Sequence, residues 1–125
     1  MNYINMYYKS DQGKNRPEPI LKVRVANTFY TKLRGLLAHK KLASMEGLLL
    51  PGCSSIHTIG MHYSLDIVFL DDKGKVMKCQ ACVKPFGAAV AKGASYTLEL
   101  VHGMIDRLGI SENDQFIWQD LESQT

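Results

Sequence analysis

The sequence has no long apolar run, and only three of its 125 residues are cysteines. A membrane-spanning helix needs about twenty consecutive apolar residues, so we expect no membrane span. Residues 1–19 contain no run of seven or more apolar residues behind a basic start, so we expect no secretory signal. These absences predict a soluble, cytoplasmic protein. In that compartment the three thiols are expected to stay reduced.

No motif typical of nucleic-acid binding accompanies the basic residues. Residues 1–50 carry nine Lys or Arg against three Asp or Glu, whereas residues 51–125 carry six against nine. Such asymmetry can indicate an anionic partner, but a solvated basic face is the commoner explanation. We therefore do not expect nucleic acid among the partners.

The composition predicts one globular domain. Hydrophobic residues make up 46% of the chain and charged residues 22%, and a chain of this length can bury a single core without disulfides or metals. The polar segment before Pro19 separates the first strand-like residues from the rest. We expect an N-terminal extension at 1–19, forming an edge strand or disordered, a globular domain at 20–118 and a frayed tail at 119–125.

Several segments have the patterns of β-strands. Alternation of apolar and polar residues predicts strands at 20–25, 75–83 and 95–101, and apolar runs predict buried strands at 47–50 and 65–70. Residues 71–74 have the composition of a hairpin turn, and 116–118 read as a closing strand. In the strand at 75–83, alternation puts Met77, Cys79, Ala81 and Val83 on one face and Lys78, Gln80 and Cys82 on the other.

Two segments have helical patterns. Asn27 and Thr28 can cap a helix whose apolar residues, from Phe29 to Leu37, recur on one stripe. A shorter helical turn at 104–108 ends at Gly109, in the position favoured for left-handed backbone geometry. The sequence therefore predicts one or two short helices beside many strands.

An ordered set of short motifs spans residues 20–118. Its main members are Thr31-Lys-Leu-Arg-Gly-Leu-Leu37, Glu46-Gly-Leu48, His57-Thr-Ile-Gly-Met61, Leu65-Asp-Ile-Val-Phe-Leu-Asp71, Gly74-Lys-Val76, Pro85, Leu98-Glu-Leu100, Gly103 and Arg107-Leu-Gly-Ile-Ser-Glu-Asn-Asp114. In this order the chain resembles the family called domain of unknown function 192. The resemblance implies a compact β-rich domain and no established activity. The expected fold class is α+β: a β-rich single domain with a barrel-like, mostly antiparallel sheet and one or two short helices.

Two features depart from that family. Asn113 stands before Asp114 where relatives usually have Gly, and Asn tolerates the same positive φ. Many relatives have an aromatic residue near the position of His57, and Cys79 and Cys82 match no family motif. Chemistry built on these residues would belong to this branch alone.

The stretch from Cys53 to Gly74 concentrates the groups that could carry chemistry. It holds a cysteine, two of the four histidines and the strongest strand signal. We predict a non-enzymatic module that binds a small ligand or a protein near this stretch, with the Gly- and Ala-rich loop 86–94 at its border. The candidate ligand-binding residues are Cys53, His57, Met61, Asp66 and Glu99.

The two acidic residues of this set lie in apolar strands and need partners. Asp66 is expected to accept hydrogen bonds from the backbone of the preceding loop, His57 to Tyr63, or else to orient His57 or His62. Glu99 is expected to anchor a turn or to pair with Arg34.

Two chemical alternatives stay open. Cys53 could act as a nucleophile with His57 as its base, in a hydrolase-like enzyme, although no third orienting residue is evident. Cys53 and His57 could also bind zinc together with Cys79 and Cys82. Because strand alternation separates the last two sulfurs, we predict no metal and no cofactor.

Overall fold

A hairpin forms one end of the main sheet of the structure, a computed structural model that describes residues 2–9, 20–25, 45–57 and 63–120. The strand β5 (Leu65–Leu70) is buried at every residue, and Asp71 to Gly74 turn the chain into β6 (Val76–Val83). Asp71 Oδ1 accepts the backbone N–H groups of Lys73 and Lys75, which fixes this turn. The expected hairpin is therefore present.

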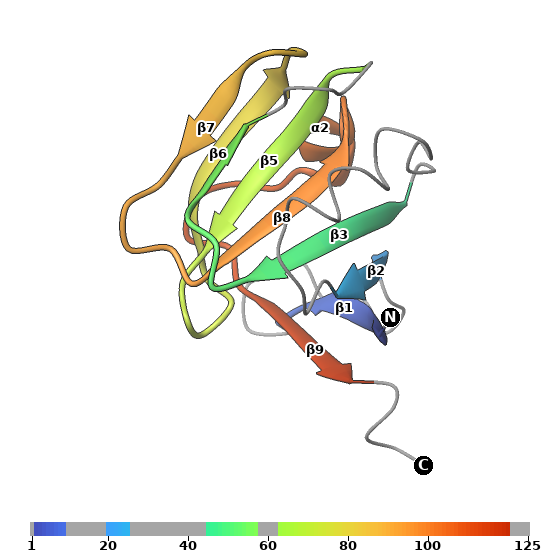
Figure 1. Ribbon diagram of the computed structural model, residues 1–125. Helices are drawn as coiled ribbons and strands as arrows, with labels where there is room; N and C mark the ends of the chain where they lie inside the picture. The colour runs from blue at the N-terminus through green and yellow to red at the C-terminus, as the bar shows by residue number, and fades with distance from the viewer. Residues whose placement is uncertain (1, 10–19, 26–44, 58–62, 121–125) are drawn as a thin grey trace.

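Seven strands make one mixed sheet in the order β6-β5-β8-β3-β2-β1-β9 (Figure 1). All neighbours are antiparallel except β2 and β3, which are parallel. The other strands of this sheet are β1 (Asn2–Tyr8), β2 (Leu21–Val25), β3 (Glu46–Pro51), β8 (Tyr96–Val101) and β9 (Phe116–Asp120). Together with one short helix in the described residues, this arrangement confirms the expected β-rich α+β class.

The strand β1 lies inside the sheet and not at its edge, since it pairs with β2 on one side and β9 on the other. Its residues Ile4, Met6 and Tyr8 are buried. The Tyr8 ring stacks on Phe116, with centroids 5.0 Å apart, and its hydroxyl donates to the carbonyl oxygen of Leu108 at 2.9 Å. The segment predicted as an N-terminal extension thus supplies part of the core.

The sheet has a hydrophobic cluster on each face. On one face the helix α2 (Met104–Leu108) buries Met104 and Leu108 against residues such as Val68 and Leu100. On the other face a two-stranded ribbon of β4 (Ser55–His57) and β7 (Ala88–Val90) covers a second cluster. Figure 1 shows α2 and the ribbon on opposite sides of β5. We call these the α2 face and the ribbon face.

Two bulges interrupt the alternation of β6. The pairing with β5 slips between Leu65 and Ile67 and again between Phe69 and Leu70. As a result Cys79 packs with the α2-face cluster while Val83 belongs to the ribbon-face cluster. The prediction that these two residues share a face is wrong, because each bulge inserts a residue and reverses the side-chain order.

The sheet curves but does not close into a barrel. The residues just before its two end strands form a bridge between Lys75 and Gln115. Backbone hydrogen bonds beside it run from Phe116 N–H to the Gly74 carbonyl oxygen and from Val76 N–H to the Asp114 carbonyl oxygen. Beyond Phe116 the strands β9 and β6 separate. The fold is thus barrel-like only at this contact, which we call the seam.

The helix predicted from Phe29 to Leu37 lies outside the described residues, whereas the shorter one at 104–108 is confirmed as α2. Within the described part of the chain, no helix has the length and apolar character that crossing a membrane requires.

Candidate functional site

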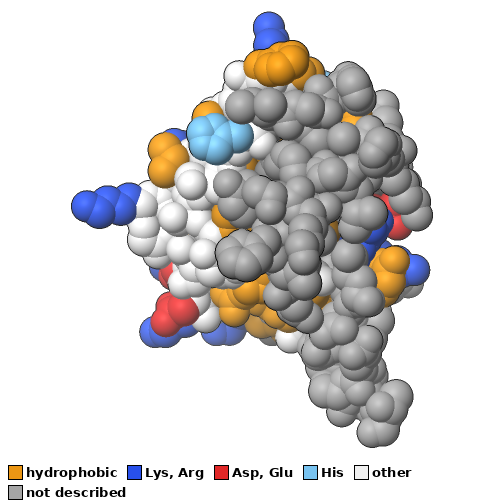
Figure 2. Space-filling view, in the orientation of Figure 1, with side chains coloured by type: hydrophobic (Ala, Val, Ile, Leu, Met, Phe, Trp, Pro, Cys, Tyr) orange, Lys and Arg blue, Asp and Glu red, His pale blue; other side chains and the backbone are white. Residues whose placement is uncertain are grey.

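The outer side of the β4–β7 ribbon is the main exposed surface of the predicted region. Alternation turns Ile56 and Ala89 inward, where they are buried, and leaves Ser55, His57, Ala88 and Val90 exposed. Figure 2 shows uncharged and hydrophobic side chains gathered over this part of the molecule, with a histidine among them. The surface is therefore mostly neutral at its centre.

Phe86 stands at the entrance of β7 in an unusual backbone conformation. Its φ is +64°, and the Gly87 N–H donates to the Lys84 carbonyl oxygen at 2.9 Å, which makes Lys84 to Gly87 a β-turn. Pro85 holds the second position and Phe86 the third, where turns with a positive φ normally require Gly or Asn. The Phe86 side chain is 78% exposed, so it projects into solvent.

A second turn, at the other end of β7, has a glycine at the position that Phe86 occupies in the first. The Ala94 N–H donates to the Ala91 carbonyl oxygen at 3.1 Å, and the third position is Gly93, with φ +88°. The two turns have the same hydrogen-bond pattern, but only one of them holds an aromatic residue. We call Phe86, Ala88, Val90, Ser55 and His57 the Phe86 surface.

Cys53 and His57 do not form a nucleophile–base pair. The Cys53 thiol donates to the carbonyl oxygen of Ser55 at 3.0 Å and packs against the ribbon-face cluster. The Thr97 hydroxyl donates to the Cys53 carbonyl oxygen at 2.7 Å, which ties this turn to β8. His57 is exposed on the outer side of the ribbon. The geometry thus assigns Cys53 a packing role.

Asp66 is completely buried and binds backbone donors. Its Oδ1 accepts the Cys82 N–H at 2.9 Å, and its Oδ2 accepts the Gly103 and Ile105 N–H groups at 3.0 and 2.9 Å. His102 Nδ1 lies 3.3 Å from Oδ1. A backbone-binding role was expected; the donors among the described residues belong to β6 and to the start of α2. Residues 58–62 of the loop named for this role lie outside the described residues.

The predicted site residues divide between the two faces of the sheet. Asp66 pairs with Leu100, which belongs to the α2-face cluster, and the buried Glu99 pairs with Ile67 of the ribbon-face cluster. Neighbouring residues of a strand point in opposite directions. Asp66 therefore lies on the side opposite to His57 and Glu99. Met61, His62 and Arg34 lie outside the described residues.

The four potential zinc ligands are not gathered either. Cys79 packs on the α2 face, and Cys82 lies in the first β6 bulge with φ +55°. Among the described residues, no group of three His, Cys, Asp or Glu side chains is arranged to hold a metal ion. Residues Cys53, His57, Cys79 and Cys82 are all described.

A hollow of about 540 Å³ opens beside α2. Asp66 and His102 lie in its wall, together with Ile105, Asp106 and Ser111. The buried carboxylate here is already engaged by four groups, and the His102 side chain is 55% exposed. These hydrogen bonds join β5, β6 and α2, so the role of Asp66 is structural.

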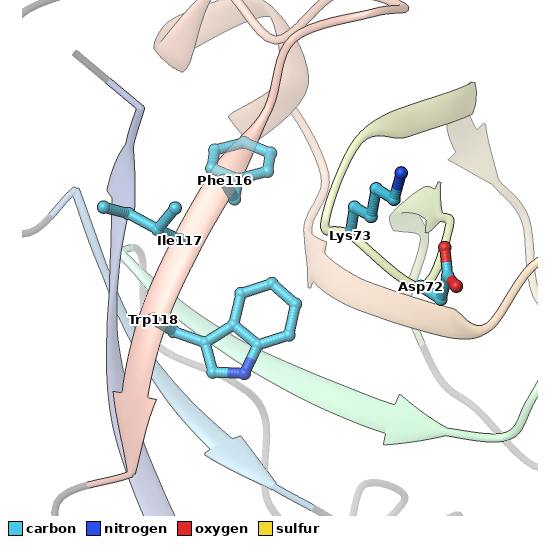
Figure 3. A pocket seen from close by; sticks show the side chains of 5 residues that line it. All are labelled: Asp72, Lys73, Phe116, Ile117 and Trp118. Carbon is cyan, nitrogen blue, oxygen red and sulfur yellow. The ribbon is translucent and has the colours of Figure 1, made fainter.

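A smaller hollow of about 210 Å³ lies where the seam opens. Figure 3 shows the Trp118 ring extending from β9 toward the turn that carries Asp72 and Lys73, while Ile117 points the other way. The Trp118 ring also contacts Tyr96 edge to face, with centroids 5.2 Å apart. This hollow is a wedge between diverging strands.

Sequence reasoning placed loop 86–94 at the border of the site but read it as a flexible Gly- and Ala-rich segment. The structure instead contains β7 between two turns, with Phe86 and Val90 exposed. The available signal was Pro85, which favours the second position of a β-turn and so places Phe86 at the third.

A family model and two curated proteins match most of this chain. The model of the family DUF192, described as "Uncharacterized ACR", matches residues 10–118. UPF0127 proteins of Thermococcus sibiricus and Thermococcus kodakarensis are 30% and 29% identical, covering 83% and 82% of this chain and 70% and 68% of their own length.

Two crystal structures share the fold. One, described as a candidate transcription regulator from Sinorhizobium meliloti, has a TM-score of 0.74 at 21% identity, covering 94% of this chain and 92% of its own. The other, a protein of unknown function from Novosphingobium aromaticivorans, has a TM-score of 0.68 at 26% identity, covering 78% and 75%. With the family model matching most of its length, this chain belongs to the DUF192 family of uncharacterised proteins.

Proposed function

We propose that the protein is a non-enzymatic accessory module of the cytoplasm that binds a partner protein through the Phe86 surface. The observation that carries this proposal is the conformation of Phe86, an aromatic residue held at positive φ with 78% of its side chain exposed.

The positive φ of Phe86 lowers the stability of the fold, and its exposed ring contributes little stability. Left-handed backbone geometry disfavours an L-residue with a Cβ by about 1–2 kcal/mol, and an exposed ring gains almost nothing from the hydrophobic effect. Gly93 occupies the equivalent position of the matching turn. Strained residues that the fold does not need are concentrated at functional sites. The ring is therefore retained for contact with another molecule.

The neighbours of Phe86 suit a protein interface. Val90 is 56% exposed, and Ala88 is exposed beside it. Ser55 and His57, across the ribbon, add polar groups at the side of this apolar strip. An aromatic anchor with polar groups around it is the usual composition of a protein-binding hot spot.

The ribbon recognises its partner through side chains. Lys78 Nζ donates to the Val90 carbonyl oxygen at 2.8 Å, and Gln80 Nε2 donates to the Ala88 carbonyl oxygen at 3.4 Å. Both bonds occupy acceptors on the β7 edge that adjoins β6. Addition of a partner strand at this edge is thus disfavoured, and the exposed outer side provides the contact.

The test is selection of a random peptide library, displayed on phage, against the parent and against Phe86→Asn. Asn adopts positive φ readily, so the turn is expected to survive while the ring is lost. We expect peptides that bind the parent and bind Phe86→Asn at least tenfold more weakly. Peptides that bind both proteins equally would refute the Phe86 surface as the contact.

A further inference from the structure

The sequence around the Phe86 surface is basic over a long stretch. From Lys73 to Leu98 there are five lysines and neither Asp, Glu nor Arg. The strands β6 and β7 and the start of β8 lie within this stretch. The three residues of β4, across the ribbon, add no acidic group. The strand β7 and the turns on both sides of it therefore carry lysines and no acidic residue.

Three of the five lysines adjoin the Phe86 surface. Lys84 is the first residue of the Phe86 turn, and Lys92 belongs to the turn that follows Val90; both are exposed. Lys78 reaches the Val90 carbonyl oxygen with its ammonium group. Figure 2 shows basic side chains projecting at the rim of this part of the molecule, beside hydrophobic ones. An apolar strip thus has ammonium groups around it.

On the basis of the proposed function, we propose that the partner is a protein segment in which an apolar side chain is flanked by Asp or Glu. The apolar side chain packs on Phe86 and Val90, and the carboxylates approach Lys78, Lys84 and Lys92. Exposed ion pairs contribute at most about 1 kcal/mol each, so the apolar contact supplies most of the affinity. The lysines steer the encounter and select acidic segments over basic ones.

Single-stranded nucleic acid fits this surface less well. Its binding grooves combine a basic track with several aromatic side chains that stack successive bases. Phe86 is the one aromatic residue of the Phe86 surface, and the lysine-rich stretch contains no arginine. A short protein segment needs only one aromatic contact and a few charges.

A lipid surface also fits less well. Stable membrane attachment requires a large buried apolar area or two separate anchoring signals. Of the described large apolar residues, only Phe86 and Val90 are exposed on the ribbon. Full burial of each would supply about 1.5–3 kcal/mol, which gives weak attachment at best.

The experiment uses the peptides selected on the parent and measures their affinity for three full-length variants by fluorescence titration. The variants are Phe86→Asn, the double variant Lys84→Gln/Lys92→Gln, and the control Lys73→Gln/Lys75→Gln. The control removes the same charge at the opposite end of β6, next to the seam. All measurements are made at low and at physiological salt.

We expect peptides enriched in an apolar residue with Asp or Glu on both sides. Their affinity should fall at least tenfold for Phe86→Asn, about threefold to tenfold for Lys84→Gln/Lys92→Gln, and less than twofold for the control. Added salt should weaken binding to the parent more than binding to Lys84→Gln/Lys92→Gln.

Peptides that require Phe86 but carry no excess of Asp or Glu would overturn this inference and leave the proposed function standing. Failure to select any Phe86-dependent peptide would overturn both. Phosphatidylserine vesicles that sediment the parent but not Phe86→Asn, with no acidic peptide selected, would assign the surface to lipid and also overturn the inference.

Discussion

The side chains of Asp66 and Phe86 both contrast in polarity with their surroundings. Asp66 is a carboxylate at the centre of an apolar strand, and Phe86 is an aromatic ring in water. The Asp66 carboxylate has partners inside the molecule, because three backbone N–H groups donate hydrogen bonds to it and His102 Nδ1 lies 3.3 Å from its Oδ1. The Phe86 ring stays exposed beside the ribbon, and we therefore propose that a partner covers it.

Asp66→Ala is expected to destabilise the protein strongly. The change leaves the partly buried N–H groups of Cys82, Gly103 and Ile105 without their acceptor, at about 1–3 kcal/mol each. We expect a loss of at least about 3 kcal/mol in the free energy of unfolding, measured by urea titration. Asp72→Ala, which removes an exposed carboxylate, serves as the control and should change stability little. Equal stability of Asp66→Ala and the parent would contradict the assigned role.

The Cys53 thiol is expected to react slowly with a thiol reagent at neutral pH. It is half-buried and packs against the ribbon-face cluster, and its Sγ is engaged with the Ser55 carbonyl oxygen, so access of the reagent is restricted. Labelling of Cys53 in the native protein should be at least tenfold slower than in urea, as followed by mass spectrometry. Rapid and selective modification of Cys53 would instead support the hydrolase-like alternative.

The sequence predicted the acceptor role of Asp66 but not its donors. A carboxylate in an apolar strand must bind something, and nearby backbone groups are the first candidates. The actual donors lie 16, 37 and 39 residues further along the chain. Only the folded sheet brings them to Asp66, so local reasoning could not name them.

At the scale of the elements, boundaries were predicted well and side-chain directions less well. β5 has the predicted bounds, and β2, β3, β8 and α2 agree with the predictions within about two residues. β6 was also found, but its two bulges reverse the side-chain order twice. A bulge depends on pairing with the neighbouring strand, and for this reason simple alternation put Cys79 and Val83 on one face.

The corrected position of Cys79 strengthens the prediction about metal. Cys79 packs among apolar residues on the α2 face, while His57 is exposed on the ribbon face. We expect the purified protein to contain no stoichiometric zinc, and a strong chelator should leave its melting temperature unchanged, since a structural metal would contribute to folding. One equivalent of zinc by elemental analysis would contradict this.

At the scale of the whole molecule, the seam decides how far the sheet closes. Gly74 has φ +81°, and a Cβ there would collide with the Phe116 carbonyl oxygen and lie 3.1 Å from Trp118 Cζ3. This close approach lets β9 meet the start of β6. The sequence predicted a barrel-like sheet, but where it stays open depends on contacts between residues 74 and 116, which are far apart in the chain.

Gly74→Ala is expected to cost about 3 kcal/mol, from the positive φ and from overpacking against β9. Gly93→Ala is the matched control, because Gly93 also has positive φ but a Cβ there meets nothing within 4 Å. The control should lose only about 1 kcal/mol. Urea unfolding measures both, and equal losses would show that the seam does not constrain the fold.

The predicted site residues are divided between the two faces of the sheet. Asp66 lies on the α2 face of the sheet, whereas Cys53 and Glu99 lie toward the ribbon. Loop 86–94 was predicted near the site, and it supplies the ribbon strand β7. The exposed aromatic residue could not be foreseen, since exposure depends on how the ribbon packs on the sheet.

We propose that the Phe86 ring serves contact with a partner and does not stabilise the fold. The most direct measurement is the free energy of unfolding of Phe86→Asn compared with the parent, with the reverse change Gly93→Phe as control. We predict that Phe86→Asn is as stable as the parent or more stable by up to about 1 kcal/mol, and that Gly93→Phe loses about 1 kcal/mol. A loss of more than about 1 kcal/mol in Phe86→Asn would show that the ring supports the fold and would contradict the claim.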